Sequence, residues 1–258
     1  MKTYSTPSSD STLISISTSG FSDTALLFVH GWLGNKHWWD KQVEAFKSDY
    51  LVATMDLAGH GDSGKSRKDY TSKLYADDIV AVAKSLPAKE VILVGHSMSG
   101  AYALEAGPHI KNLKAIVVID TLKDLDLSFS PEQIDSILNL YSGDFGVCVE
   151  KVLPDYLFVE TTPPAVKEKI KSEFLSQSDF ARPAIEALYF MDMKKFARAV
   201  DVPLRAINSD NSPTNIENNR KYLKDYNFKV IKRTGHYPML EDPEAFNSAL
   251  KETLIELG

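Results

Sequence analysis

The chain has 258 residues, 43% of them hydrophobic, which is enough for a sizeable core in one α/β domain with an insertion. Its formal net charge is −6 and its basic residues are scattered, which argues against a nucleic-acid partner. Cys148 is the single cysteine, the first twenty residues are too polar for a signal peptide, and no window approaches about 18 consecutive apolar residues. We therefore expect a cytoplasmic protein that does not span a membrane.

Short β-branched apolar runs alternate with segments of helical spacing along most of the chain. This alternation is typical of a mostly parallel sheet with crossover helices. The predicted strands span residues 12–18, 25–30, 51–56, 91–95, 115–120, 203–208 and 228–232. The predicted helices span residues 36–47, 71–86, 98–106, 216–225 and 243–257. The sequence therefore predicts an α/β fold with a doubly wound sheet covered by helices on both faces.

Residues 121–200 break this alternation. They contain no convincing buried strand and show proline-initiated helical segments that begin near residues 131, 163 and 182. We expect a helical cap inserted into a core of residues 1–120 and 201–258. Because the insertion follows a strand at the carboxyl edge of the sheet, where such sheets bind ligands, a lid is favoured over helices packed outside the sheet.

The stretch VILVGHSMSG, residues 91–100, carries a serine directly after a predicted buried strand. In a G-x-S-x-G turn, the serine takes a strained backbone conformation that holds its hydroxyl above the sheet edge. Gly95 and Ser97 fit this pattern, whereas Ser99 replaces the second glycine and Gly100 follows it. The alternative is an ordinary loop in which Ser97 caps the next helix. The turn favours Ser97 as a nucleophile. The choice between nucleophile and helix cap depends on whether the chain supplies catalytic partners for Ser97.

A serine nucleophile needs a base within hydrogen-bond reach and a third group that orients the base. Of the six histidines, His236 follows the last predicted strand, so its loop is expected over the same sheet edge. His96 adjoins Ser97 and is expected to pack beside the nucleophile. His30 and His60 lie in glycine-bounded loops and are expected to make structural hydrogen bonds. The sequence therefore favours His236 as the base.

Two aspartates compete for the role of orienting acid. Asp210 lies just past the predicted strand 203–208, and Asp120 ends the predicted strand 115–120. We favour Asp210, because its strand neighbours the strand that precedes His236 and the reach is shorter. Asp210 also stands among turn-forming residues, so an Asx-turn role is compatible with this prediction.

Acyl transfer places negative charge on the carbonyl oxygen, which two backbone N–H groups can stabilise. We expect one donor from Met98, the residue after the nucleophile. The other is expected from Trp32 in the loop HGWLG, for which a turn with a packed tryptophan is the alternative.

With these residues assembled, the chain resembles the α/β-hydrolase superfamily over nearly its whole length apart from the cap. The segments that carry the resemblance are FVHGWLGNKHWWD, MDLAGHGDSG, VGHSMSGAYALEA and TGHYPMLEDPEAF. The resemblance implies Ser97 as nucleophile, His236 as base, Asp210 as acid, and the backbones of Trp32 and Met98 as oxyanion donors. Serine as the nucleophile argues against the dehalogenases and epoxide hydrolases of the superfamily, which use an aspartate.

These residues predict a carboxylesterase-like serine hydrolase that cleaves a small or medium, mainly apolar ester or lactone through an acyl-enzyme. Trp32 and Tyr237 are expected to contact the substrate. Two alternatives stay open: a carbon–carbon bond hydrolase or lyase on the same triad, and a non-catalytic ligand receptor with this fold. No metal or organic cofactor is implied, and the expected partner is a small-molecule substrate. The sequence does not specify the oligomeric state.

Overall fold

The computed structural model describes residues 1–177 and 184–258, and in these residues eight strands form one sheet. The strands lie in the order β1-β2-β4-β3-β5-β6-β7-β8. The pairs β1–β2 and β2–β4 are antiparallel, and the other neighbours are parallel. The strand bounds are β1 Lys2–Pro7, β2 Leu13–Ser19, β3 Thr24–Val29, β4 Leu51–Met55, β5 Glu90–His96, β6 Leu113–Ile119, β7 Leu204–Ser209 and β8 Tyr226–Ile231.

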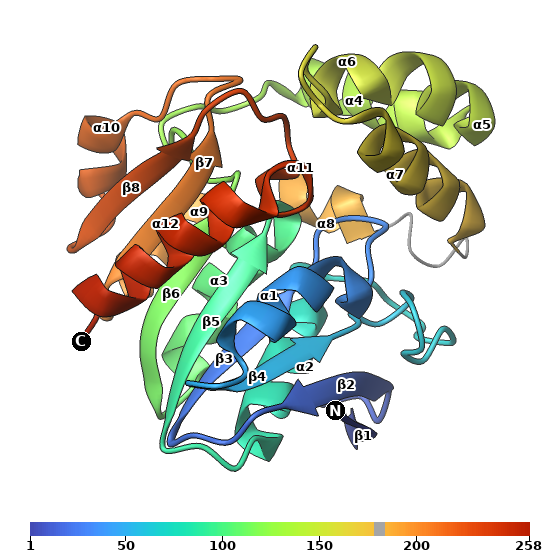
Figure 1. Ribbon diagram of the computed structural model, residues 1–258. Helices are drawn as coiled ribbons and strands as arrows, with labels where there is room; N and C mark the ends of the chain where they lie inside the picture. The colour runs from blue at the N-terminus through green and yellow to red at the C-terminus, as the bar shows by residue number, and fades with distance from the viewer. Residues whose placement is uncertain (178–183) are drawn as a thin grey trace.

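Helices cover both faces of this sheet (Figure 1). Helices α1 and α12 lie on one face, and α2 and α3 lie on the other, where α9 packs against α3. The bounds outside residues 121–200 are η1 Lys36–Trp39, α1 Asp40–Phe46, α2 Ser72–Ser85, α3 Met98–Ala106, η2 Gly107–His109, α10 Ile216–Arg220, α11 Pro238–Glu241 and α12 Pro243–Glu256. The predicted doubly wound α/β fold is confirmed.

The central strands are mostly apolar because both of their faces are covered. Every residue of β4 is buried, and in β3 only Thr24 is partly exposed. Strand β1 lies at the sheet edge, alternates exposed and half-buried residues, and has the polar sequence KTYSTP. Because this sequence is polar, β1 is not among the predicted strands. The predicted helix 36–47 is divided into η1 and α1, and the predicted helix 216–225 ends at Arg220, before the chain enters β8.

The chain between β6 and β7, residues 121–200, is called here the inserted segment. Its helices in the described residues are α4 Pro131–Ser142, α5 Phe145–Val147, η3 Cys148–Val152, α6 Leu153–Leu157, α7 Pro164–Ser176, α8 Ala184–Tyr189 and α9 Met193–Ala199. Figure 1 shows α4 to α7 grouped beyond the carboxyl ends of the strands, whereas α8 and α9 approach α3. The predicted helix that begins at residue 182 corresponds to α8 and α9, and its first two residues lie outside the described residues.

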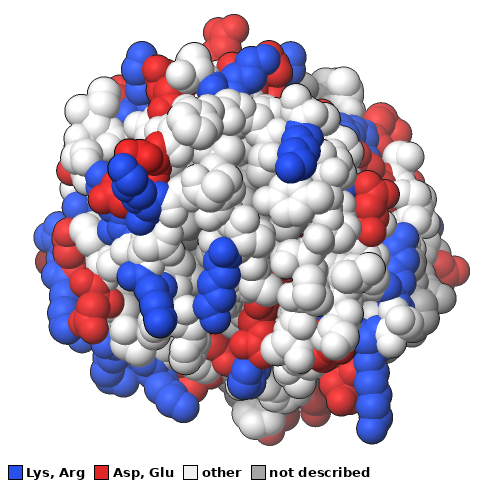
Figure 2. Space-filling model, turned by 90° about the horizontal axis from the view of Figure 1, so that it is seen from below, with Lys and Arg blue, Asp and Glu red and all other residues white. Residues whose placement is uncertain are grey.

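The face opposite this group carries charge of both signs. Figure 2 shows acidic side chains next to basic ones around a largely uncharged centre. Within residues 1–177 and 184–258, the structure contains no helix with the length and apolar character needed to cross a membrane.

Candidate active site

Ser97 forms the turn between β5 and α3. Its backbone has φ 55° and ψ −122°, in the left-handed half of the Ramachandran map, where a residue with a side chain is strained. The turn is tight, because a Cβ atom at Gly95 would lie 2.6 Å from the carbonyl oxygen of Ser99. The Ser99 hydroxyl donates to the carbonyl of His30, so the serine that replaces the second glycine has its own partner. The predicted turn geometry at Ser97 is therefore present.

His236 lies between two oxygen atoms, one on each side of its ring. Its Nε2 is 2.8 Å from Oγ of Ser97, and its Nδ1 is 2.7 Å from Oδ2 of Asp120. Because a carboxylate only accepts, Nδ1 carries the proton and donates to Asp120, which leaves Nε2 to accept from the Ser97 hydroxyl. The three side chains come from the ends of β5, β6 and β8 at one sheet edge.

The backbone around His236 is fixed by hydrogen bonds on several sides. Its N–H donates to the carbonyl of Leu157 at 2.8 Å, and its carbonyl accepts from Nε2 of His96, also at 2.8 Å. The Glu241 carboxylate accepts from the two N–H groups that flank residue 236, at 2.8 and 3.0 Å. These contacts hold the imidazole in place before any ligand binds.

His96 supports the site as a neutral ring. Burial, together with the nearby His236, lowers the pKa of His96 to about 3. A neutral imidazole carries one N–H, and in His96 this N–H donates to the carbonyl of His236. The expectation that His96 packs beside the nucleophile matches this placement, with ring centroids of His96 and His236 4.9 Å apart.

The Asp120 carboxylate accepts a hydrogen bond from the imidazole of His236 and also contacts Ser209 and Lys123. Its Oδ1 accepts from the backbone N–H and the hydroxyl of Ser209, at 2.8 and 2.6 Å, and lies 2.9 Å from Nζ of Lys123. Burial alone would raise the pKa of the Asp120 carboxyl, but the hydrogen bond and charge of His236, with Lys123 and Ser209, hold that pKa well below its usual range. The carboxylate therefore stays ionised despite being buried.

The expectation that Asp210 orients His236 is wrong for this geometry. Asp210 is exposed, and its Oδ1 accepts from the backbone N–H of Arg233 at 2.8 Å. Its neighbour Ser209 is the residue of this loop that faces the site, through two hydrogen bonds to Asp120. Asp210 therefore stabilises the turn before His236, as a turn-forming aspartate does. Asp120, the alternative acid, is the aspartate that lies next to the imidazole.

The loop after β3 lies directly against the Ser97 turn. A Cβ atom at Gly31 would lie 3.1 Å from Cβ of Ser97 and 2.5 Å from Nδ1 of His96. Trp32 follows Gly31 and lines a cavity with Ser97, while Met98 opens α3 immediately after the serine. Of the two residues predicted as backbone donors, Trp32 therefore lines the same cavity as Ser97, and Met98 follows Ser97 in the chain.

The cavity at Ser97 measures about 180 Å³ and is called here the serine chamber. Trp32 and Tyr237, the two predicted substrate contacts, both line it. The Tyr237 ring is buried edge-on against Trp38 at 5.4 Å. The other lining residues are His96, Ser97, Leu153, Tyr156, Leu157, Phe174, Ile185, Leu188, Tyr189 and His236. The inserted segment therefore supplies most of the apolar wall.

Three supporting residues were not anticipated from the sequence: Glu241, Lys123 and Ser209. Glu241 could have been suspected, because it stands only five residues after His236, at the end of the short helix α11. Ser209 leaves no local signal, since its contact with Asp120 depends on β6 and β7 being neighbours in the sheet. Lys123 stands three residues after Asp120, and its contact depends on the bend of the chain after β6. In the described part of the chain, no group of three or more His, Cys, Asp or Glu side chains is placed to hold a metal ion.

The fold and the site together define an alpha/beta hydrolase. The model of the alpha/beta hydrolase family matches residues 26–249, and the chain belongs to that family. A Haemophilus influenzae protein named "Putative esterase/lipase" is 28% identical over 248 residues, covering 89% of this chain and 82% of that protein.

Solved structures share the fold over the full length. An esterase from Thermogutta terrifontis superposes with a TM-score of 0.86 at 22% identity and covers 100% of this chain and 99% of its own. The enol-lactonase from Burkholderia xenovorans superposes with a TM-score of 0.81 at 17% identity and covers 98% of this chain and 100% of its own.

Proposed function

We propose that this protein is a serine hydrolase that cleaves a small or medium, mainly apolar carboxylic ester or lactone through an acyl-enzyme. The observation that carries the proposal is the double contact of His236, with Ser97 at 2.8 Å and Asp120 at 2.7 Å. Ser97 is the nucleophile, His236 the general base, and Asp120 the acid that orients the imidazole. The names of relatives, which include an esterase/lipase and an enol-lactonase, support ester chemistry.

The reaction begins when the Ser97 oxygen attacks the ester carbonyl and its proton passes to Nε2 of His236. The resulting oxyanion takes hydrogen bonds from the backbone N–H groups of Trp32 and Met98. His236 then gives the proton to the leaving alcohol as the carbon–oxygen bond breaks, which leaves the acyl group on Ser97. Water, deprotonated by the same imidazole, attacks the acyl-enzyme and releases the acid. In a lactone, the leaving alcohol stays attached to the released acid.

The serine chamber supports a substrate that is uncharged where it meets Ser97. Its walls are largely aromatic and aliphatic side chains, and its volume of about 180 Å³ is small. We also propose that residues 121–200 act as a cap. Leu157 of this segment accepts the backbone N–H of His236, and Trp32 packs edge-on against Phe174 at 5.8 Å, so the segment contacts both sides of the site.

The test is a panel of p-nitrophenyl acetate, p-nitrophenyl butyrate, simple lactones and a diketone, measured on the wild type and on Ser97→Ala. We expect ester or lactone turnover that falls at least about 10³-fold in Ser97→Ala. The exposed Ser48→Ala is a matched control and should keep full activity. Diketone cleavage with inert esters would replace the proposal with carbon–carbon bond hydrolysis, and a folded wild type inert on the whole panel would favour a ligand receptor.

A further inference from the structure

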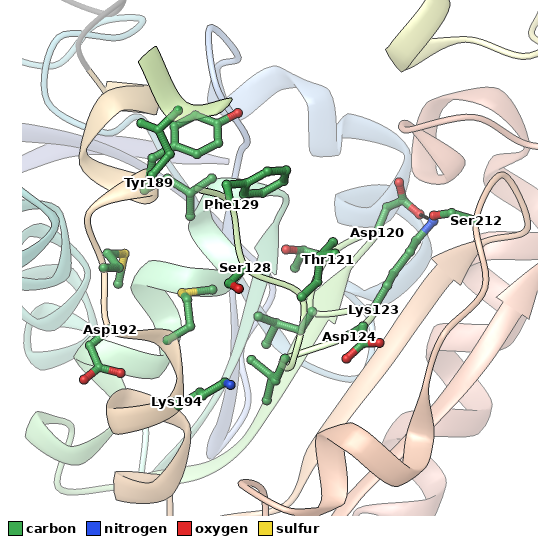
Figure 3. A pocket seen from close by; sticks show the side chains of 17 residues that line it. Asp120, Thr121, Lys123, Asp124, Ser128, Phe129, Tyr189, Asp192, Lys194 and Ser212 are labelled. Atoms are coloured by element: carbon green, nitrogen blue, oxygen red, sulfur yellow. Dashed lines mark ion pairs between the residues drawn. The ribbon is translucent and has the colours of Figure 1, made fainter. Parts of the chain in front are cut away.

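A second cavity lies beside the serine chamber and is more than three times larger. It measures about 620 Å³ against about 180 Å³ and is called here the side cavity. Figure 3 shows it bounded by the chain that follows β6, which begins at Asp120, and by the stretch from Tyr189 to Lys194. Ligand pockets usually measure about 300–1,000 Å³. The serine chamber alone falls below that range, and the side cavity lies inside it.

Leu188 and Tyr189, at the end of α8, line both cavities. Figure 3 shows the Tyr189 ring beside Phe129, and their centroids are 5.9 Å apart in an edge-on arrangement. Both shared residues are partly exposed, and both pack against the edge of the hydrophobic core. A change of rotamer at these two residues would join the cavities without movement of the sheet. These side chains therefore form the partition between the two cavities.

The side cavity is lined mainly by apolar side chains. They are Leu122, Leu125, Leu127, Phe129, Ile134, Leu188, Met191 and Met193. Leu127 is 68% exposed and Phe129 46% exposed, although a folded protein gains by covering large apolar side chains. Methionine side chains adapt to ligands of different shape.

The charged groups in the wall of the side cavity are already engaged with the protein. Lys123 is paired with Asp120, and Lys194 lies 3.1 Å from the Asp126 carboxylate. Asp124 accepts from the side-chain amide of Asn218 at 2.9 Å, and Asp192 accepts from the backbone of α9. A charged ligand would have to compete with these contacts, whereas an alkyl or aryl group would cover the exposed apolar side chains.

We propose that the side cavity is a second subsite, which takes the longer apolar half of an ester whose carbonyl lies at Ser97, with Leu188 and Tyr189 as the partition that moves aside. This inference rests on the proposed function and names the substrate class more closely: esters with one short half and one extended, uncharged alkyl or aryl half. Each methylene that enters the side cavity should raise kcat/KM by about fourfold until the space is filled.

The experiment measures kcat/KM for two ester series, because the extended half is either the acyl or the alcohol part. One series is p-nitrophenyl esters from acetate to decanoate, and the other is acetates from ethyl to decyl. Met191→Trp fills the side cavity without touching the serine chamber. Phe190→Trp is the matched control, since Phe190 is 72% exposed and lines neither cavity.

In one of the two series, we expect kcat/KM to rise with chain length in the wild type and in Phe190→Trp. In Met191→Trp it should fall at least tenfold for the longest member and change less than twofold for the shortest. Equal chain-length profiles in wild type and Met191→Trp, with the short esters turned over normally, would overturn the subsite while leaving the proposed function intact.

A binding measurement tests the subsite even if no ester is turned over. Decyl acetate and p-nitrophenyl decanoate are each titrated into Ser97→Ala by calorimetry. We expect at least one to bind, and the double variant Ser97→Ala/Met191→Trp to bind that ester at least tenfold more weakly. Equal affinity in the two variants, or no binding of either ester to Ser97→Ala, would contradict the inference. Thermal melting of each variant checks that the tryptophan has not unfolded the inserted segment.

Discussion

Strands β6 and β7 are parallel neighbours, and the chain leaves both at the same edge of the sheet with an aspartate. The side chain of Asp120, after β6, is 2% exposed and contacts His236, Ser209 and Lys123. Asp210, after β7, is exposed and accepts one backbone hydrogen bond, from Arg233. Two carboxylates in equivalent topological positions thus have different surroundings.

The surroundings of a carboxylate, and not its position along the sheet edge, therefore decide which of the two contacts the imidazole. A buried carboxylate is costly unless several donors compensate its charge, and Asp120 has them. The chain after β6 also bends sharply, with φ 47° at Asp120 and 52° at Leu122. That bend brings Lys123 back to the carboxylate of Asp120, three residues earlier in the chain.

The largest expected effect is the loss of activity in Asp120→Asn, and Asp210→Asn is the matched comparison. Asp120→Asn should lower kcat/KM for the best ester by roughly 10³–10⁴-fold, because the amide no longer fixes the tautomer or stabilises the imidazolium. Asp210→Asn should stay within about threefold of the wild type, because the Asp210 side chain is exposed and accepts from the backbone N–H of Arg233. Steady-state kinetics of the purified variants measure both.

An opposite ranking, with Asp210→Asn inactive and Asp120→Asn active, would restore Asp210 as the acid. Circular dichroism of the two variants separates loss of activity from loss of fold. A wild-type spectrum is required of both before the kinetics are compared.

A smaller effect is expected from Ser209→Ala, which removes one of the donors to Asp120. The backbone N–H of residue 209 remains, so the carboxylate loses a single charge-assisted hydrogen bond. Such a bond is worth about 1.5–3 kcal/mol, and we expect roughly a tenfold fall in kcat with KM little changed. Asp210→Asn, which alters the exposed neighbouring residue of the same loop, is the control. A fall of the same size in both variants would show that the loop, and not the contact to Asp120, matters.

The smallest effect is expected from Lys123→Met and concerns pH. The Lys123 ammonium is one of the groups that hold the pKa of the Asp120 carboxyl below its usual range. Its removal should raise the pKa of Asp120, so the carboxylate is neutralised at a higher pH when the solution is acidified. The acid limb of the kcat/KM profile should therefore move to higher pH.

Asp120 also accepts from Ser209 and His236. Neither residue is altered in Lys123→Met, so the shift reports on the ammonium. Lys123→Arg keeps the positive charge and should keep the wild-type profile. An acid limb that stays in place in Lys123→Met, or moves to lower pH, would contradict this role.

The sequence was sufficient to predict the fold and the placement of Ser97 and His236 at one edge of the sheet, because these depend on local rules. Apolar runs mark buried strands, and a residue at the end of a parallel strand must lie at the carboxyl edge. The same rules fit Asp120 and Asp210 equally, so they could not separate the two. That choice depends on the bend after β6 and on Ser209 and Lys123, which meet only in the folded sheet. Glu241, which pins the histidine loop, also acts through tertiary contacts.

His236 joins Ser97 to Asp120 through two hydrogen bonds. The rate at which a fluorophosphonate labels the protein tests whether these contacts activate Ser97, and it can be measured without knowing the substrate. We predict rapid labelling of the wild type and of Asp210→Asn at equal rates. Mass spectrometry should place the adduct on Ser97, and labelling of Asp120→Asn should be at least about 100-fold slower. Labelling of Asp120→Asn at the wild-type rate, or an adduct on another residue, would contradict the account.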